Sequence, residues 1–169
     1  MARGCDSVAY VTVGTGIGVG ILSGGRMVHG LGHPEVGHLK LRRHPLHAGF
    51  DGSCPYHGDC LEGLASGPAI QAAFGAPLDQ IDPDHQAWRI EAHYLGQLCA
   101  TLILTVAPQH IVLGGGVMNQ RRLLDGVRAV SLEVLGDYAG AWDARAAATR
   151  ITCTGCNEPP GLIGAYLIA

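Results

Sequence analysis

Extended runs of β-branched and aromatic residues open the chain. The first run covers residues 7–13 and the second covers residues 17–22, with a Gly-Thr-Gly turn between them. Another glycine turn at residues 24–25 leads into a shorter run over residues 26–29. Such runs are typical of β-strands, and glycine tolerates the backbone angles of tight turns. The pattern therefore predicts three strands in an antiparallel meander.

The apolar positions after residue 60 change to helical spacing. A helix is predicted to begin near Leu61 and to be split at Gly67-Pro68, because proline cannot continue the hydrogen-bond ladder of a helix. Residues 86–106 are apolar on most faces, which predicts a buried helix that ends before Pro108. The rest of the pattern predicts, in order, a strand over 110–113, a helix over 121–135, a strand over 150–153 and a closing helix over 161–168. This order predicts an α/β domain in which parallel crossovers follow the meander.

Residues 31–60 fit neither pattern, because histidine, proline, glycine and cysteine crowd together there without periodicity. Within this segment, Cys54, His57 and Cys60 have the spacing C-x2-H-x2-C. Zinc prefers four sulfur or nitrogen ligands in a tetrahedron, and Gly58 lets the turn between the ligands tighten. A bound ion would also stabilise a segment without a core of its own. We therefore predict a zinc site, with a disulfide between Cys54 and Cys60 as the alternative.

The fourth zinc ligand must come from outside this motif, and several histidines lie upstream of it. These are His33, His38, His44 and His47. We favour His38, because Gly37 beside it permits a sharp turn. His44 and His47 lie in a basic loop, where we expect solvated side chains.

Composition limits the classes of function that remain. With 47% hydrophobic and 15% charged residues among 169, the chain can form one folded domain with its own core. Its net charge of −3 argues against nucleic acid or an anionic membrane as the main partner. The sequence shows no signal peptide and no apolar run long enough to cross a bilayer. We expect a cytoplasmic protein, and in a reducing compartment cysteine clusters bind metal more often than they form disulfides.

Two glycine turns follow predicted strands and are candidates for nucleotide binding. Gly14, Thr15 and Gly16 follow the first strand, where bare backbone amides and a hydroxyl can converge on an anion. A strand rather than a helix follows this turn, so it is not a Rossmann fingerprint. The second turn, between a strand and a helix, suits a base or ribose lying against bare backbone and consists of Gly114, Gly115 and Gly116. Each turn alone is also explained as an ordinary tight connection.

Together these motifs resemble the ROK family of sugar kinases and regulators, and within it the fructokinase branch. VTVGTGIG at residues 11–18 is similar to the second phosphate-binding hairpin of actin-like sugar kinases. HPEVGH at residues 33–38 resembles the E-x-G-H signature, and CPYHGDCLE at residues 54–62 resembles a histidine-containing form of the family's zinc motif. IVLGGGV at residues 111–117 resembles the adenosine motif, and GLIGA at residues 161–165 resembles the terminal helix. The resemblance runs through nearly the whole chain in the expected order.

The resemblance implies an α/β fold, the ribonuclease H-like half of the actin-like ATPase (sugar kinase) fold with an inserted zinc-binding loop. It implies transfer of the γ-phosphoryl group of ATP, with Mg2+, to a hexose, with fructose the first choice. The residues implied to hold a structural Zn2+ are His38, Cys54, His57 and Cys60. Of the residues implied to bind the sugar, Glu35 and Glu62 would hydrogen-bond its hydroxyls, and His38 would stand beside it. The first glycine turn would face the ATP phosphates and the second the adenosine. We also expect a homodimer.

Two family elements do not occur among the 169 residues. Full kinases of this type have an amino-terminal domain that supplies a D-x-G-G-T phosphate loop and a catalytic aspartate in a D-x-N-like segment. The resemblance over residues 1–169 therefore covers a single carboxy-terminal domain, and we expect no appreciable kinase activity from this polypeptide alone. The alternatives are the sugar-sensing domain of a ROK transcriptional regulator and a non-catalytic, zinc-stabilised module.

Overall fold

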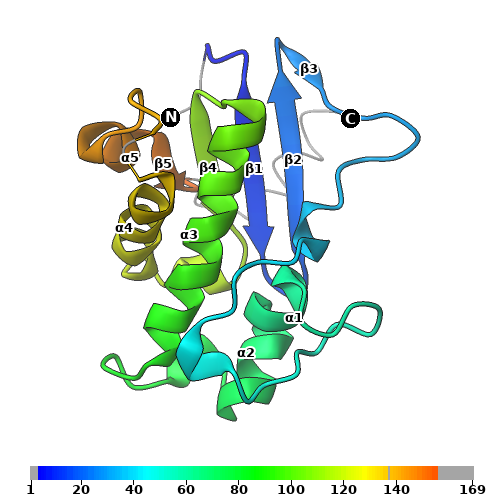
Figure 1. Cartoon of the computed structure of the whole chain (residues 1–169), viewed down its shortest axis with the longest axis vertical. Helices are drawn as coiled ribbons and strands as arrows, with labels where there is room; N and C mark the ends of the chain where they lie inside the picture. Colours follow the sequence, from blue (N-terminus) through cyan, green and yellow to red (C-terminus); the bar gives the residue numbers. More distant parts are fainter. Residues whose placement is uncertain (1–3, 137, 156–169) are drawn as a thin grey trace.

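A mixed sheet forms the centre of the protein in a computed structural model that describes residues 4–136 and 138–155 (Figure 1). Its strand order is β3-β2-β1-β4-β5. The strands are β1 (Val8–Val13), β2 (Ile17–Ser23), β3 (Arg26–Met27), β4 (His110–Gly114) and β5 (Ile151–Cys153). β1, β2 and β3 pair antiparallel, whereas β4 pairs parallel with both β1 and β5. The predicted meander followed by parallel crossovers is confirmed.

The third strand is shorter than the sequence predicts. It ends at Met27, although the backbone of Val28 still donates a hydrogen bond to Ile21. The chain then turns, and the N–H of Gly30 bonds locally to the carbonyl of Gly32. Because these local bonds replace the ladder, the prediction of a strand to residue 29 is wrong by two residues.

Helices follow the meander in the predicted order. They are α1 (Leu61–Ala65), α2 (Gly67–Phe74), α3 (Ala87–Val106), α4 (Leu123–Leu135) and α5 (Ala144–Arg150). Short 3-10 turns lie at Val36–His38, Pro45–His47, Leu78–Gln80 and Val117–Asn119. Ser66 separates α1 from α2 and caps α2, because its hydroxyl accepts from the N–H of Ala69. α5 was not predicted, since only one of its seven residues is buried and the apolar signal is therefore weak. The predicted closing helix over residues 161–168 lies outside the described residues.

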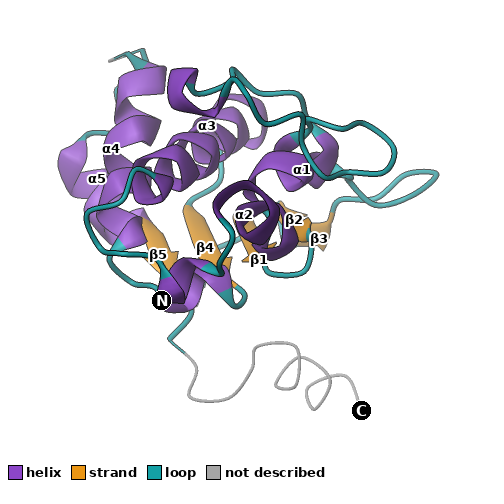
Figure 2. Cartoon of the chain, turned by 90° about the horizontal axis from the view of Figure 1, so that it is seen from below, coloured by secondary structure: helices purple, strands orange, loops and turns teal. Residues whose placement is uncertain are grey.

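The core lies between the sheet and α3, with α4 packed beside α3. α3, α4 and α5 occupy the same side of the sheet (Figure 2). Leu95 and Leu98 of α3 are fully buried, as its apolar pattern predicts. The two long helices approach closely at Gly96, where an added Cβ would lie 2.6 Å from the side chain of Val130. Among the described helices, none is both long and apolar enough to span a membrane.

Candidate functional site: a cysteine–histidine cluster beside two glycine turns

Four of the predicted ligands meet at one point of the structure. The ligand atoms of His38, Cys54, His57 and Cys60 all lie within 4.8 Å of one another. His38 Nδ1 is 3.8 Å from the sulfur of Cys54 and 3.5 Å from that of Cys60, and His57 Nδ1 is 3.7 Å from Cys54. In a tetrahedral zinc site, sulfur and nitrogen ligands lie about 3.6 Å apart. The donor atoms therefore fit a tetrahedral ion, and both cysteines are free thiols.

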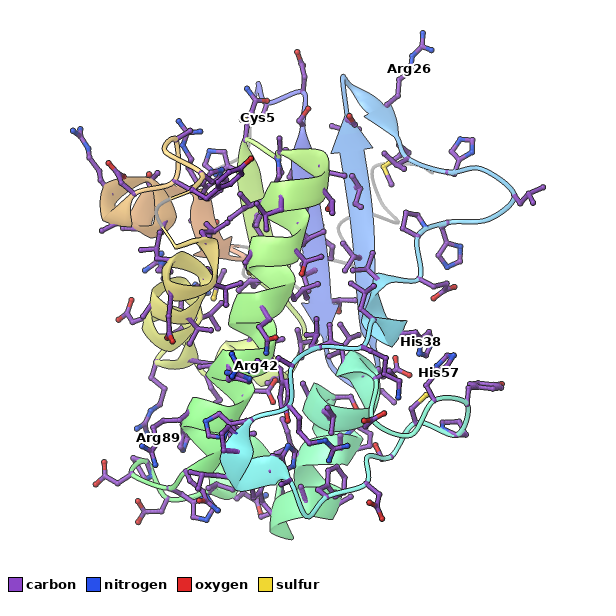
Figure 3. The ribbon with its side chains drawn as sticks, viewed as in Figure 1. Cys5, Arg26, His38, Arg42, His57 and Arg89 are labelled. Atoms are coloured by element: carbon purple, nitrogen blue, oxygen red, sulfur yellow. The ribbon has the colours of Figure 1, made fainter. Side chains whose placement is uncertain are left out.

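The backbone of the loop explains how three of these ligands converge. Cys54 and Gly58 form an isolated antiparallel bridge, with backbone hydrogen bonds of 3.2 and 2.9 Å. Gly58 has φ of +60°, which glycine adopts without strain, so the turn reverses within the motif. Cys60 then lies at the start of α1 and is fully buried, whereas His57 is exposed. In Figure 3, His57 lies next to His38 at the edge of the molecule.

Contacts outside the cluster tie the His38 segment to this loop. The carboxylate of Asp59 forms ion pairs with Lys40 and Arg43, the latter at 2.9 Å. Lys40 also donates to the carbonyl of His57 at 2.7 Å. The N–H of Leu61 donates to the carbonyl of Leu39 at 2.8 Å. These protein contacts therefore join the two halves of the ligand set.

The thiol of Cys54 is poised toward its metal-binding form. Burial raises the pKa of this thiol. Hydrogen bonds from the backbone N–H groups of His57 and Tyr56 and from the Cys60 thiol lower the same pKa. The net pKa of Cys54 lies below the usual value. Burial raises the pKa of the Cys60 thiol. Because the thiolate is the form that binds metal, one cysteine of the pair is already favoured as a ligand.

Two of the upstream histidines behave differently from the prediction. His47 is buried, so the expectation of a solvated side chain is wrong. Its ring stacks on Phe50 and Phe74, and its Nδ1 lies 3.0 Å from the hydroxyl of Tyr94. His44 is half-buried, and its Nδ1 accepts from the N–H of Leu46. Aromatic packing therefore places His47 in the interior, which the charge of the surrounding sequence could not indicate.

The carboxylate of Glu62 connects the cysteine–histidine cluster to the first glycine turn. Glu62 is the second residue of α1, and its Oε2 accepts from the N–H of Ile17 at 2.9 Å. A Cβ on Gly16 would lie 2.6 Å from the same oxygen, so a larger residue there would displace this carboxylate. Oε1 of Glu62 makes no hydrogen bond within the described part of the chain. It is therefore available to a ligand.

Glu35 lies further from this contact network. Its side chain is 65% exposed, and it pairs with His33 at 2.9 Å. It directly precedes the 3-10 turn that carries His38. The structure thus places Glu35 on the same short segment as a cluster ligand but gives it no described contact with Glu62.

The two glycine turns meet at the carboxyl ends of β1 and β4. A Cβ on Gly14 would lie 3.9 Å from the backbone nitrogen of Gly116, and Gly14 accepts from the N–H of Gly67 at 2.7 Å. A cavity of about 410 Å³ opens there, lined by Gly14, Thr15 and Gly116 together with Gly67, Pro68, Ile70, Gln71, Pro77, Leu78, Asp79, Val117 and Gln120. Gly16, Gly114 and Gly115 lie beside the cavity's lining rather than in it.

Three polar residues that line this cavity were not predicted from the sequence. Gln71 of α2, Asp79 and Gln120 supply polar groups to it. The polar loop over residues 77–84 was the only signal for Asp79, and no local pattern marks a helix residue such as Gln71 as a lining residue. Their position depends on how α2 packs beside the turns.

The chain is similar in sequence to known proteins of one family. The model of the ROK family matches residues 1–169. A putative fructokinase of Bacillus subtilis (strain 168) is 46% identical over 137 residues, which cover 81% of this chain and 46% of that protein. The fructokinase of Zymomonas mobilis subsp. mobilis is 41% identical over 170 residues, covering 99% of this chain and 56% of that protein. The chain spans about half the length of these curated relatives.

A solved structure shows the same fold. The ROK hexokinase from Thermus thermophilus superposes with a TM-score of 0.71 at 30% identity, covering 100% of this chain and 58% of that one. The described sheet and helices are thus those of the actin-like ATPase fold of sugar kinases, as predicted. Because the family model covers every residue of the sequence, the chain belongs to the ROK family.

Proposed function

We propose that the 169 residues form the carboxy-terminal domain of a kinase that transfers the γ-phosphoryl group of ATP to a hexose, with fructose as the sugar. The observation that carries this proposal is the hydrogen bond between Glu62 and the N–H of Ile17. It places a carboxylate with one free oxygen directly beside the turn of Gly14, Thr15 and Gly16. A sugar held by that carboxylate would lie next to a phosphate held by the turn. The names of the relatives, fructokinases at 41–46% identity, support the choice of sugar.

The cavity at the glycine turns supports a nucleotide site. We assign the ATP phosphates to Gly14, Thr15 and Gly16, and the adenosine to the turn of Gly114, Gly115 and Gly116. Mg2+ bound to ATP supplies charge neutralisation, and the chain's own groups supply position. The volume of about 410 Å³ lies within the range of small-molecule sites.

The cysteine–histidine cluster supports a structural zinc site. His38, Cys54, His57 and Cys60 would occupy all four positions of a tetrahedron, which leaves no open position for catalysis. Zinc there would hold His38 and the start of α1, and thereby position Glu62 toward the sugar. Glu35 and His38 are assigned to the remaining sugar hydroxyls.

The catalytic base is assigned to an aspartate outside these 169 residues. The resemblance to the family puts it in an amino-terminal domain together with a second phosphate loop. We therefore expect no appreciable turnover of ATP and fructose by this polypeptide alone, since a missing base and a missing phosphate clamp each cost orders of magnitude in rate. We further propose that the protein forms a homodimer.

Sugar binding tests the proposal directly. Calorimetric titration of the zinc-loaded chain with fructose should show binding, and Glu62→Gln should weaken it by about tenfold or more, because a hydrogen bond to a charged group is lost. Glutamine can still accept from Ile17, so the variant should keep the fold. Asp125→Asn on α4 is the matched control, because Asp125 is exposed and lines neither cavity, and it should bind fructose as the parent does. Failure of the parent chain to bind fructose would favour a non-catalytic module instead.

A further inference from the structure

A groove with a basic wall lies between residues 42–45 and the pair of helices α3 and α4. It has a volume of about 480 Å³, and its basic residues are Arg42, Arg43, His44, Arg89 and His93. It shares no lining residue with the cavity at the glycine turns. Five cationic or titratable bases around one groove are unexpected in a chain whose net charge is −3.

Two of these arginines have uncommitted guanidinium groups. Arg42 and Arg89 are exposed, and neither guanidinium forms a hydrogen bond or ion pair with any residue that the structure describes. Arg43 differs, because it already pairs with Asp59. In Figure 3, Arg42 lies across α3 and Arg89 projects near its amino-terminal end. The groove therefore presents two unpaired guanidinium groups, which are always charged and donate through several N–H groups.

The two histidines add a directed donor. The rings of His44 and His93 meet edge to face, with centroids 4.9 Å apart. Nε2 of His93 donates to the carbonyl of Arg42 at 2.8 Å. Nδ1 of His44 accepts from the N–H of Leu46, so neutral His44 carries its proton on Nε2, where no described group accepts it. Burial lowers the pKa of His44, and the neighbouring His93 and Arg89 lower it further.

The rest of the groove differs in character from its basic wall. Small side chains of the two helices, Ala92, Ala129 and Val130, line it, and Glu133 stands among them on α4. This carboxylate has no ion-pair partner among the described residues. A bare inorganic anion would not use this part of the groove, whereas a hydroxylated organic body could contact the small side chains and donate to Glu133.

We propose that this groove binds a phosphate monoester of a small hydroxylated molecule. The phosphate lies between Arg42, Arg89 and His44, and the organic body lies along α3 and α4 toward Glu133. Arginine recognises phosphate through paired N–H donors, and such charge-assisted bonds are stronger than neutral ones.

Calorimetric titrations of the 169-residue chain at low ionic strength test this site, with glycerol 3-phosphate and inorganic phosphate as probes at a pH high enough that both are dianions. The ester should bind, and the double variant Arg42→Ala/Arg89→Ala should weaken its binding by about tenfold or more. Arg26→Ala is the matched control, because Arg26 is an exposed arginine at the opposite end of the molecule (Figure 3). It should change the affinity by less than about twofold, as expected for a surface charge outside the site.

Three results would overturn the proposal. The first is no binding of the ester to the parent chain, and the second is equal loss in the Arg42/Arg89 and Arg26 variants, which would mean a general charge effect. The third is equal affinity for ester and inorganic phosphate, which would mean that the organic body is not recognised. The NMR titration of His44 gives an independent measurement, because bound phosphate should raise the pKa of this ring in the parent and not in the double variant.

Discussion

Two regions of this protein owe their order to different forces. α3 and α4 pack against the sheet through fully buried residues such as Leu95 and Leu98. The ligand loop, which we define as residues 31–60, has only two short 3-10 turns and a fully exposed leucine, Leu31. Three of the four ion pairs among the described residues lie in this loop, and so does the cysteine–histidine cluster. Burial of apolar surface orders the first region. Polar contacts and the stacking of His47 on Phe50 and Phe74 order the second, and the proposed zinc ion would add to them.

The comparison also explains where the candidate site lies. Glu62 is the second residue of α1, the helix that follows the ligand loop, and it bonds to the turn between β1 and β2. The site therefore stands where a region held by packing meets a region held by polar contacts. A perturbation of the loop should reach the site without unfolding the sheet.

Removal of zinc should give the largest effect on this comparison. Structural zinc contributes an apparent binding free energy on the order of 10 kcal/mol or more, so the ligand loop should lose its order on chelation. Hydrogen–deuterium exchange should show loss of protection over residues 31–60 and retained protection in α3. Equal loss in both regions would show that they form one cooperative unit.

Leu98→Ala perturbs the packed region instead of the ligand loop, and it is the control for zinc removal. Leu98 is fully buried, and truncation of a buried leucine costs about 2–5 kcal/mol. The melting temperature should fall while elemental analysis still finds one zinc per chain. A variant that lost both stability and zinc would contradict the separation of the two regions.

Glu91→Gln tests the packed region, because Glu91 is a buried residue of α3. Glu91 is 2% exposed, its Oε1 has no partner among the described residues, and burial raises its pKa well above the usual 4.5. The neutral form is thus favoured in the folded chain. The contribution of protonated Glu91 to the stability of the folded chain is complete below the usual pKa. It is lost as pH rises through the raised pKa that Glu91 has in the folded state. Each unit of elevation corresponds to about 1.4 kcal/mol.

The expected result for Glu91→Gln is a gain in stability at neutral pH that disappears below about pH 4.5. Urea unfolding of parent and variant at several pH values measures the difference, in which the shared effect of acid on the zinc ligands cancels. Glu133→Gln, an exposed change on α4, should show no such trend. A difference that is independent of pH would mean that Glu91 is ionised in the folded protein.

Asp59→Asn should produce the smallest of these effects, and the change should be limited to the ligand loop. The change removes the ion pairs to Lys40 and Arg43 that join the His38 segment to the other ligands. Loss of supporting contacts around a metal site costs about tenfold or more in affinity. We expect about tenfold faster zinc release to a chromogenic chelator, with an unchanged melting temperature of the packed region. Asp125→Asn, which breaks the ion pair to Arg128 on α4, is the control and should leave zinc release unchanged.

Much of the fold could be predicted because its signals are local. Gly67-Pro68 marked the break between α1 and α2, and the apolar faces of residues 86–106 marked α3. α5 escaped prediction, because Ala147 is its single buried residue. His47 was wrongly expected in solvent, because its partners Phe74 and Tyr94 come from helices distant in sequence.

The sequence by itself determined the types and spacing of the chemical groups: C-x2-H-x2-C, two glycine turns after strands, and the alternation of strands and helices. These depend on neighbours along the chain, whose distances are set by covalent geometry. Only the tertiary structure decided that His38 rather than His33, His44 or His47 joins the cysteines, that Glu62 bonds to Ile17, and that Arg42 lines a groove with Arg89. The packing of the helices on the sheet brings Glu62 to Ile17 and Arg42 to Arg89, whereas contacts within the ligand loop bring His38 to the cysteines.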